Sequence, residues 1–209
     1  MDASLLAIPD SQLCKKATAL AAKVSPNFLH RHCLRTFLFG QQLALLQQLT
    51  YDPELFYVSA ILHDLGLTET FSRQQRYEVD GADAARRFAL KHGLSGEKAE
   101  IIWDAIALHT SIGIANRKRA EVALVHLGAS LDVFGVGVDS LAADDVHRIF
   151  EEYPRTGFID GLTALFVKQI EQKPQVTPFT WLAEVGRCCV HGFNCLSYQD
   201  LIDNSPFDP

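Results

Sequence analysis

The stretch DPELFYVSAILHDLG, residues 52–66, has the features of one complete helix followed by a stop. Asp52 is a typical helix N-cap, and a proline and a glutamate follow it in the first turn, where both are favourable. The apolar run then predicts helix to about His63, and the last glycine of the stretch marks the end. His63 and Asp64 prefer water, yet they stand side by side at the end of this apolar helix. A hydrated helix end would explain the pair, and so would a metal site.

The helical period of 3.6 residues recurs along almost the whole chain, and no long segment shows the alternation of a strand. No repeat, low-complexity tract or linker divides the chain, so we predict an all-α fold in a single domain over residues 1–209. The helices are expected at about 11–23, 26–50, 52–63, 80–92, 95–109, 116–133, 141–152, 158–172 and 177–192. Residues 25–135 should form the core, with helices within 136–192 packed on it. Residues 193–209 should be an irregular tail.

The composition is that of an ordinary globular protein. The chain has 209 residues, of which 48% are apolar and 21% are charged. A net charge of −6 argues against nucleic acid or an anionic membrane as the main partner, and no apolar run approaches the ~18 residues of a membrane span. The five cysteines are odd in number and form no CxxC pair. We therefore expect unpaired thiols in a reducing compartment, and a cytoplasmic protein.

Four of the predicted helices carry ionisable side chains on their apolar faces, where such groups need partners. They are His32 and Arg35 in the second helix, His63 in the third, His109 in the fifth and Asp132 in the sixth. A neutral core histidine needs only one hydrogen bond, so His109 alone would more simply be structural. A buried carboxylate costs several kcal/mol unless it is paired or binds a cation, so Asp132 requires a partner. The candidate metal ligands inside such a bundle are two imidazoles and two carboxylates, from His32, His63, Asp64 and Asp132.

The ordered pattern H…HD…D resembles the motif of the HD-domain superfamily of metal-dependent hydrolases. His32 begins the stretch HCLRTFLFG, where that superfamily commonly has H-x-x-R, and His63 and Asp64 form the HD dipeptide. Asp132 lies in GASLDVFG, where the last aspartate of the superfamily usually falls. The resemblance covers roughly residues 25–135. It implies an HD-domain helical bundle with a metal held by these side chains.

A narrower resemblance runs through several stretches of the chain. HCLRTFLFG, ILHDLGLTE, RYEVDGADAARRF and AIALHTSIGIA are similar to the fungal and bacterial branch that includes cyanamide hydratase. Cyanamide hydratase adds water to the nitrile of cyanamide and gives urea. The resemblance implies a hydratase or hydrolase that acts on a small, weakly charged molecule, with cyanamide as the best guess. Close relatives need not share a substrate.

Two histidines and two aspartates would make a mixed nitrogen and oxygen ligand shell, which suits one divalent transition metal. Zinc is the first expectation, and iron, manganese, cobalt and nickel remain open because availability often decides which metal is loaded. A metal of this kind lowers the pKa of its bound water to roughly 7, and so supplies hydroxide at neutral pH. The hydroxide would attack the nitrile carbon, and the nitrogen would then be protonated.

Asp64, Glu78 and His109 are the candidates for the acid–base chemistry. Asp64 could bind the metal and also hold the water. Glu78 could face the pocket or be a solvated acid just ahead of a helix N-cap, and both interpretations stay open. Arg35 stands three residues after His32 on the same helix face. It is expected to fix a metal-bound carboxylate from outside the ligand shell, with bidentate binding of a phosphate as the alternative.

Two other functions remain open. One is the hydrolysis of a nucleotide or another phosphate ester, for which Arg73, Arg76, Arg86 and Arg87 could form a cationic rim. Leu67 weakens this hypothesis, because many HD phosphodiesterases carry a lysine at that place in an HDIGK motif. The other is a helical binding or regulatory module without catalysis, against which the complete ligand set argues. A small molecule is the expected partner of the enzyme, and a homo-oligomer stays open.

Overall fold

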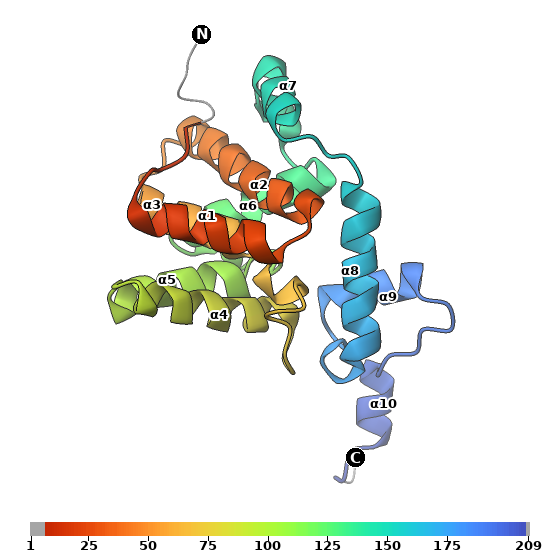
Figure 1. Ribbon diagram of the computed structural model, residues 1–209. Coiled ribbons are helices and arrows are strands. Elements are labelled where there is room, and N and C mark those ends of the chain that lie inside the picture. The colour runs from red at the N-terminus through yellow and green to blue at the C-terminus, as the bar shows by residue number, and fades with distance from the viewer. Residues whose placement is uncertain (1–6, 208–209) are drawn as a thin grey trace.

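All regular structure is helical in the part of the chain that the computed structural model describes, residues 7–207 (Figure 1). The α-helices are α1 (Gln12–Val24), α2 (Asn27–Leu46), α3 (Pro53–Leu62), α4 (Tyr77–Lys91), α5 (Gly96–Ala107), α6 (Ala120–Phe134), α7 (Ala143–Glu152), α8 (Phe158–Gln172), α9 (Trp181–Cys189) and α10 (Tyr198–Asp203). Single 3₁₀ turns lie at Leu65–Leu67, Ala115–Arg117, Val138–Ser140 and Pro174–Val176. The all-α prediction is confirmed. No helix in the described part is long and apolar enough to cross a membrane.

α4 begins earlier than predicted, and Asp80 binds the loop before it. The helix begins at Tyr77, ahead of the predicted start at Asp80. The Asp80 carboxylate accepts hydrogen bonds from the backbone N–H groups of Arg73 and Gln75, at 2.7 and 3.3 Å. It also accepts one from the Lys173 ammonium group, at 3.0 Å. Asp80 therefore fastens the loop to the C-terminal part of the chain and does not cap the helix.

The C-terminal part differs from its prediction at two places. The helix expected at 177–192 begins only at Trp181, as α9, after a 3₁₀ turn. The tail expected to be irregular contains α10, which Ser197 opens with a capping box. Residues 1–6, and residues 208–209 of the tail, lie outside the described residues.

α2 and α6 cross with their backbones in contact, and they form the most extensive helix pair of the core. A Cβ atom added to Gly128 would lie 2.1 Å from the backbone oxygen of Thr36. One added to Gly40 would lie 3.0 Å from the backbone oxygen of Leu124. A step of one turn forward along α2 is thus matched by a step of one turn back along α6, so the helices run in opposite directions. The register of this pair fixes which side chains meet one turn farther on.

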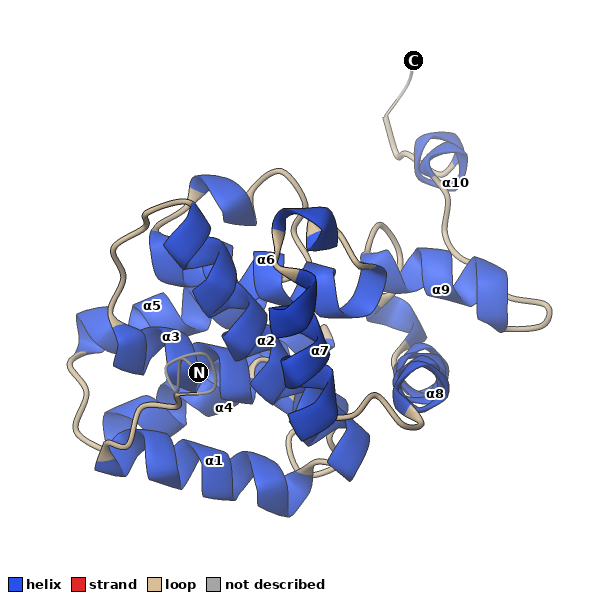
Figure 2. Ribbon diagram, turned by 90° about the horizontal axis from the view of Figure 1, so that it is seen from above, coloured by secondary structure: helices blue, strands red, loops and turns tan. Residues whose placement is uncertain are grey.

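α8 and α9 lie on one side of the body formed by α1–α6, as Figures 1 and 2 show from two directions. They carry a second apolar cluster, in which Phe158 and Leu162 of α8 join Leu29 of α2 and Tyr77 of α4. Burial of these apolar side chains is the main force that seats the C-terminal helices on the body. α8 and α9 therefore cover the side of the body where α2 and α4 begin, whereas α7 packs on the first apolar cluster through Ile149 and Phe150.

Gly128→Ala is expected to lower the free energy of unfolding by about 1–3 kcal/mol, the usual cost of forcing a methyl group into a packed interior. The new methyl would meet backbone of Thr36, which cannot turn aside as a side chain can. Urea denaturation at neutral pH measures the change. Gly96→Ala is the matched control, because nothing lies within 4 Å of a Cβ at this helical glycine. It should leave the protein equally or more stable, and an equal loss in both variants would contradict the backbone contact.

Candidate metal centre

The HD dipeptide lies in a tight turn at the end of α3. His63 is the C-cap of α3, and a 3₁₀ turn over Leu65–Leu67 follows Asp64. A Cβ atom at Gly66 would lie 1.9 Å from the backbone oxygen of Tyr77, so the turn packs directly against the first residue of α4. Only 1% of His63 and 4% of Asp64 are exposed. The turn therefore holds an imidazole and a carboxylate inside the protein, and the hydrated helix end is excluded.

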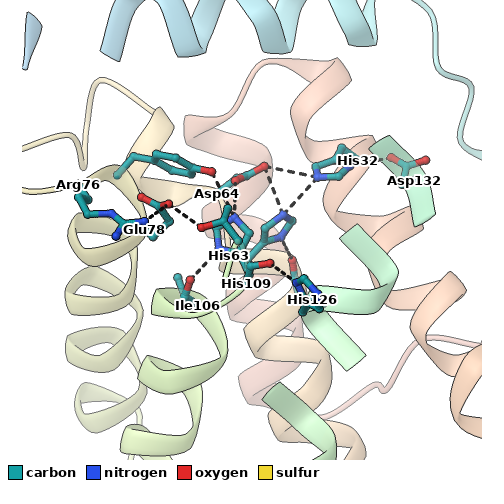
Figure 3. A network of polar contacts seen from close by, with 12 residues as sticks. His32, His63, Asp64, Arg76, Glu78, Ile106, His109, His126 and Asp132 are labelled. Carbon is teal, nitrogen blue, oxygen red and sulfur yellow. Dashed lines mark hydrogen bonds and ion pairs between the residues drawn. The ribbon is translucent and has the colours of Figure 1, made fainter. Parts of the chain in front are cut away.

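His32 of α2 meets the HD pair in the interior. The Nε2 atoms of His32 and His63 lie 3.2 Å apart, and Asp64 Oδ2 lies 3.5 and 3.3 Å from them. One ligand atom from each residue lies within 4.8 Å of the others, close enough for one metal ion. Figure 3 shows the three side chains turned toward one another. The structure thus brings together three of the four predicted ligands.

Hydrogen bonds fix which nitrogen of each imidazole faces this cluster. His63 Nδ1 donates to the backbone oxygen of Ala60 at 2.7 Å, and His32 Nδ1 donates to Asp132 Oδ2 at 2.6 Å. A carbonyl or carboxylate oxygen can only accept, so each Nδ1 carries a hydrogen, and Nε2 is the nitrogen whose lone pair each neutral imidazole can offer to a metal ion. Two such lone pairs beside a carboxylate need a cation between them. The donor set fits a divalent transition metal whose imidazole ligands are held from outside.

A proton can take the place of that cation. Burial opposes charge on both His63 and Asp64, but each of them stabilises the charged form of the other. The pKa of the Asp64 carboxyl is held well below its usual range, and the pKa of His63 is raised well above its usual value. Burial lowers the pKa of His32, which leaves it as the acceptor from His63. A metal ion at this site would compete with a proton for His63.

Asp132 lies behind His32, on the side away from the cluster (Figure 3). It stands one turn beyond Gly128 on α6, and His32 stands one turn before Thr36 on α2, so the antiparallel register makes the two neighbours. The carboxylate is fully buried, and Arg35 binds it through two bonds, Nε to Oδ1 at 2.7 Å and Nη2 to Oδ2 at 2.8 Å. The structure differs from the prediction here: Asp132 accepts a hydrogen bond from the His32 imidazole and stands outside the group of three side chains. Arg35 does fix a carboxylate, but one that lies outside this group.

His109 is a further ionisable side chain of the centre. Its Nδ1 donates to the backbone oxygen of Ile106 at 2.6 Å. Its Nε2 lies 3.7 Å from Asp64 Oδ1 and 3.5 Å from the Tyr77 hydroxyl. Burial, and after it the charge on His63, lowers the pKa of His109 to about 4. Its imidazole is therefore neutral near neutral pH and presents Nε2 beside the Asp64 carboxylate.

A cavity of about 210 Å³ opens onto the cluster. His32, His63, Asp64 and His109 form its polar end, with Tyr77. The other walls are mostly apolar and come from the loop after α5, from α6 and the residues after it, and from α8 and α9. The apolar lining residues are Ile112, Leu127, Ala129, Val133, Phe134, Val136, Leu162, Phe166 and Trp181. Among the described residues, no lysine or arginine lines this cavity.

The helices that build this centre coincide with a known domain. A sequence model of the HD domain matches residues 29–132, from the start of α2 to the last aspartate of the motif. This chain is an HD-domain protein. Two Saccharomyces cerevisiae proteins, Cyanamide hydratase DDI2 and Cyanamide hydratase DDI3, are each 23% identical to it over 171 residues. The matched region covers 79% of this chain and 76% of each yeast protein. The resemblance to the HD superfamily and to cyanamide hydratase is confirmed.

Residues beyond the HD match close the outer side of the centre. Phe158, the first residue of α8, stacks on the His32 imidazole with ring centroids 4.8 Å apart. The Arg35 guanidinium lies 5.0 Å from the centroid of the Phe158 ring. Arg35 Nη1 also donates to the backbone oxygens of Tyr153 and Pro154, at 3.1 and 3.3 Å. The C-terminal segment therefore contacts the innermost side chains of the HD motif.

Glu78 of the HD domain is buried, with 2% exposed, which contradicts the interpretation as a solvated loop acid. Its carboxylate accepts hydrogen bonds from the Thr110 hydroxyl at 2.7 Å and from Arg76 Nη2 at 2.9 Å. Thr110 lines the cavity, whereas Glu78 does not. Glu78 therefore reaches the cavity only through Thr110.

His126 is a cavity residue that the sequence reasoning missed. Its Nδ1 donates to the backbone oxygen of His109 at 2.7 Å, and its ring lines the cavity of the HD domain. A signal was present in the sequence. Val122, His126 and Ala129 are spaced by four and three residues, which places His126 on one helix face with two apolar side chains.

Arg35→Met is expected to lower the free energy of unfolding by about 3–5 kcal/mol, because it leaves the Asp132 carboxylate buried without its guanidinium. Arg35→Lys keeps the charge but loses the two-bond geometry, so its loss should be smaller. Urea denaturation of metal-free protein gives both values. Lys118→Met is the matched control, since Lys118 pairs with Asp104 at 2.8 Å on the surface, and it should cost about 1 kcal/mol or less. If Arg35→Met cost no more than the control, the buried pair would not stabilise the fold.

Proposed function

We propose that this HD-domain protein is a metal-dependent hydratase or hydrolase that adds water to a small neutral molecule, with cyanamide as the first candidate substrate. The observation that carries the proposal is the meeting of His32, His63 and Asp64 at a cavity, with both imidazoles held so that Nε2 faces inward. The similarity to the two yeast cyanamide hydratases supports the reaction type.

Three protein groups would hold the metal: Nε2 of His32, Nε2 of His63 and the Asp64 carboxylate. Three nitrogen and oxygen ligands with a position left for water are typical of catalytic zinc sites, so zinc is the first choice. When bound, such an ion lowers the pKa of its water and polarises the substrate. The buried pair of Asp132 and Arg35 would keep the His32 ring in position for this role.

His109 is the best-placed side chain to move the proton. Its neutral Nε2 lies 3.7 Å from Asp64 Oδ1, beside the place where water and substrate would meet. It can accept a proton from the attacking water at Nε2 and return it to the nitrile nitrogen. The hydrogen bond from Nδ1 to Ile106 keeps that nitrogen pointing into the site. Asp64, whose carboxyl stays ionised, would hold the water as a hydrogen-bond acceptor.

The lining of the cavity argues against a phosphate ester as the substrate. Phosphate recognition needs cationic side chains, and none lines the cavity within the described residues. Two arginines of the expected rim have other partners: Arg76 pairs with Glu78, and Arg86 pairs with Glu100. Arg73 donates to a backbone oxygen of the neighbouring Ser72. A neutral substrate fits this surface better.

The cysteines bear on where the protein works. All five are unpaired, and the adjacent Cys188 and Cys189 are exposed at the end of α9. Exposed neighbouring thiols are stable in a reducing compartment and are easily oxidised elsewhere. We therefore extend the proposal to a cytoplasmic enzyme that acts on a diffusible small molecule.

His63→Ala is expected to abolish both the bound metal and the release of urea from cyanamide, because it removes one of three ligands. Metal is measured by mass spectrometry on protein purified without chelator, and urea by a colorimetric assay. His147→Ala is the matched control, since His147 is exposed on α7 and pairs with Glu151 across one helical turn. It should keep the metal and the activity of the unmodified chain.

Phosphate release from a panel of nucleotides is measured on the same preparations. Nucleotide turnover without any urea would overturn the hydratase proposal and restore the phosphohydrolase. A metal content that His63→Ala leaves unchanged would overturn the assignment of the site. Chelation followed by addition of zinc should restore urea release in the unmodified chain and not in His63→Ala.

A further inference from the structure

The cavity is built from two unlike parts. One end holds the ligand cluster and His109, and the remaining wall is apolar. Leu162 and Phe166 of α8 and Trp181 of α9 supply much of that wall. The HD match ends at residue 132, so these side chains come from a part of the chain outside it. The polar end fits the hydration reaction. The apolar wall indicates that a bound molecule also has an apolar part.

Cyanamide leaves most of this wall without a partner. It has three non-hydrogen atoms, and a water molecule occupies about 30 Å³ of liquid, so cyanamide needs roughly 90 Å³ at most. The cavity offers about 210 Å³. The space that remains would hold water against apolar side chains, which is unfavourable. An apolar group on the substrate would fill it and displace that water.

Two aromatic side chains of the cavity lining pack against each other. Phe134 closes α6 and Trp181 opens α9, and their ring centroids lie 5.4 Å apart with an interplanar angle of 72°. Phe134 is 59% exposed and Trp181 is partly buried. The edge-to-face pair offers an aromatic surface to whatever projects from the cavity.

We propose that the substrate is a neutral nitrile, such as an N-substituted cyanamide, whose nitrile carbon reaches the cluster and whose apolar substituent lies along α8 and α9. This inference rests on the hydratase function proposed above. The oxygen of water bonds to the nitrile carbon, a carbonyl double bond replaces the two carbon–nitrogen π bonds, and both protons of the water end on the nitrile nitrogen. An N-alkylcyanamide therefore gives an N-alkylurea, with no change of oxidation state and no co-reactant.

The test compares cyanamide with its N-methyl, N-propyl and N-benzyl derivatives on the metal-loaded protein. We expect kcat/KM to rise about three- to fourfold for each methylene that the wall covers. Calorimetry on metal-free protein gives a readout that does not depend on turnover. N-benzylcyanamide should bind measurably there, and cyanamide should not.

Two variants test where the substituent lies. Leu162→Trp fills the cavity and should lower the ratio of kcat/KM for N-benzylcyanamide to that for cyanamide by tenfold or more, in line with the several methylenes it displaces. Phe134→Ala removes an exposed ring without overpacking the interior and should lower the same ratio several-fold. Leu90→Trp is the control, because Leu90 is 45% exposed on α4 and does not line the cavity. It should leave the ratio unchanged.

Failure of the two proposals would look different. No turnover of any cyanamide by metal-loaded protein would overturn the hydratase function itself. Turnover of cyanamide that exceeds that of every substituted derivative would leave the hydratase in place and overturn the inference about the substituent. A preference for N-benzylcyanamide that survives both Leu162→Trp and Phe134→Ala would also overturn it, because the substituent would then lie elsewhere.

Discussion

The backbone contact between α2 and α6 is the constraint on which the centre depends. At Gly128 there is no room for a side chain, because the oxygen of Thr36 occupies the place of its Cβ. The antiparallel register that follows sets His32 against Asp132 and brings Arg35 to the same carboxylate. The bond from Nδ1 then turns Nε2 of His32 toward the HD dipeptide. A helix crossing that only a glycine allows thus decides the orientation of the His32 imidazole, more than 90 residues away in sequence.

Much of this could be predicted from the sequence, because the signals were local. Asp52 does cap α3, with its side chain accepting from the N–H groups of Glu54 and Leu55, and the HD dipeptide does end that helix. The helical period also placed Asp132 on an inward face. It could not show which buried cation Asp132 meets, since that depends on the register between two helices far apart in the chain. For the same reason the burial of Glu78 was left open, because its partner Thr110 lies on another helix end.

The electrostatics of the centre follow from the hydrogen bonds that its imidazoles make. His32, His63 and His109 each donate the Nδ1 hydrogen to an oxygen outside the cluster. The acceptors are Asp132, Ala60 and Ile106, respectively. Each of these Nε2 atoms is thereby left facing the buried Asp64 carboxylate. Such an arrangement is costly for a bare protein, and the cost falls when a divalent ion binds. This arrangement of side chains is typical of a cation-binding site and is not typical of a hydrophobic core.

The contact of Phe158 and residues 153–154 with the centre has a consequence for how the chain can be divided. Arg35 donates to the backbone at Tyr153 and Pro154, and the ring of Phe158 lies against both Arg35 and His32. A fragment trimmed to the boundaries of the family match would expose to water the guanidinium of Arg35 and the imidazole of His32, which the intact protein buries. The smallest piece able to reproduce the chemistry of this protein must therefore extend at least through the first turns of α8. The family boundary and the functional boundary are different places in the chain.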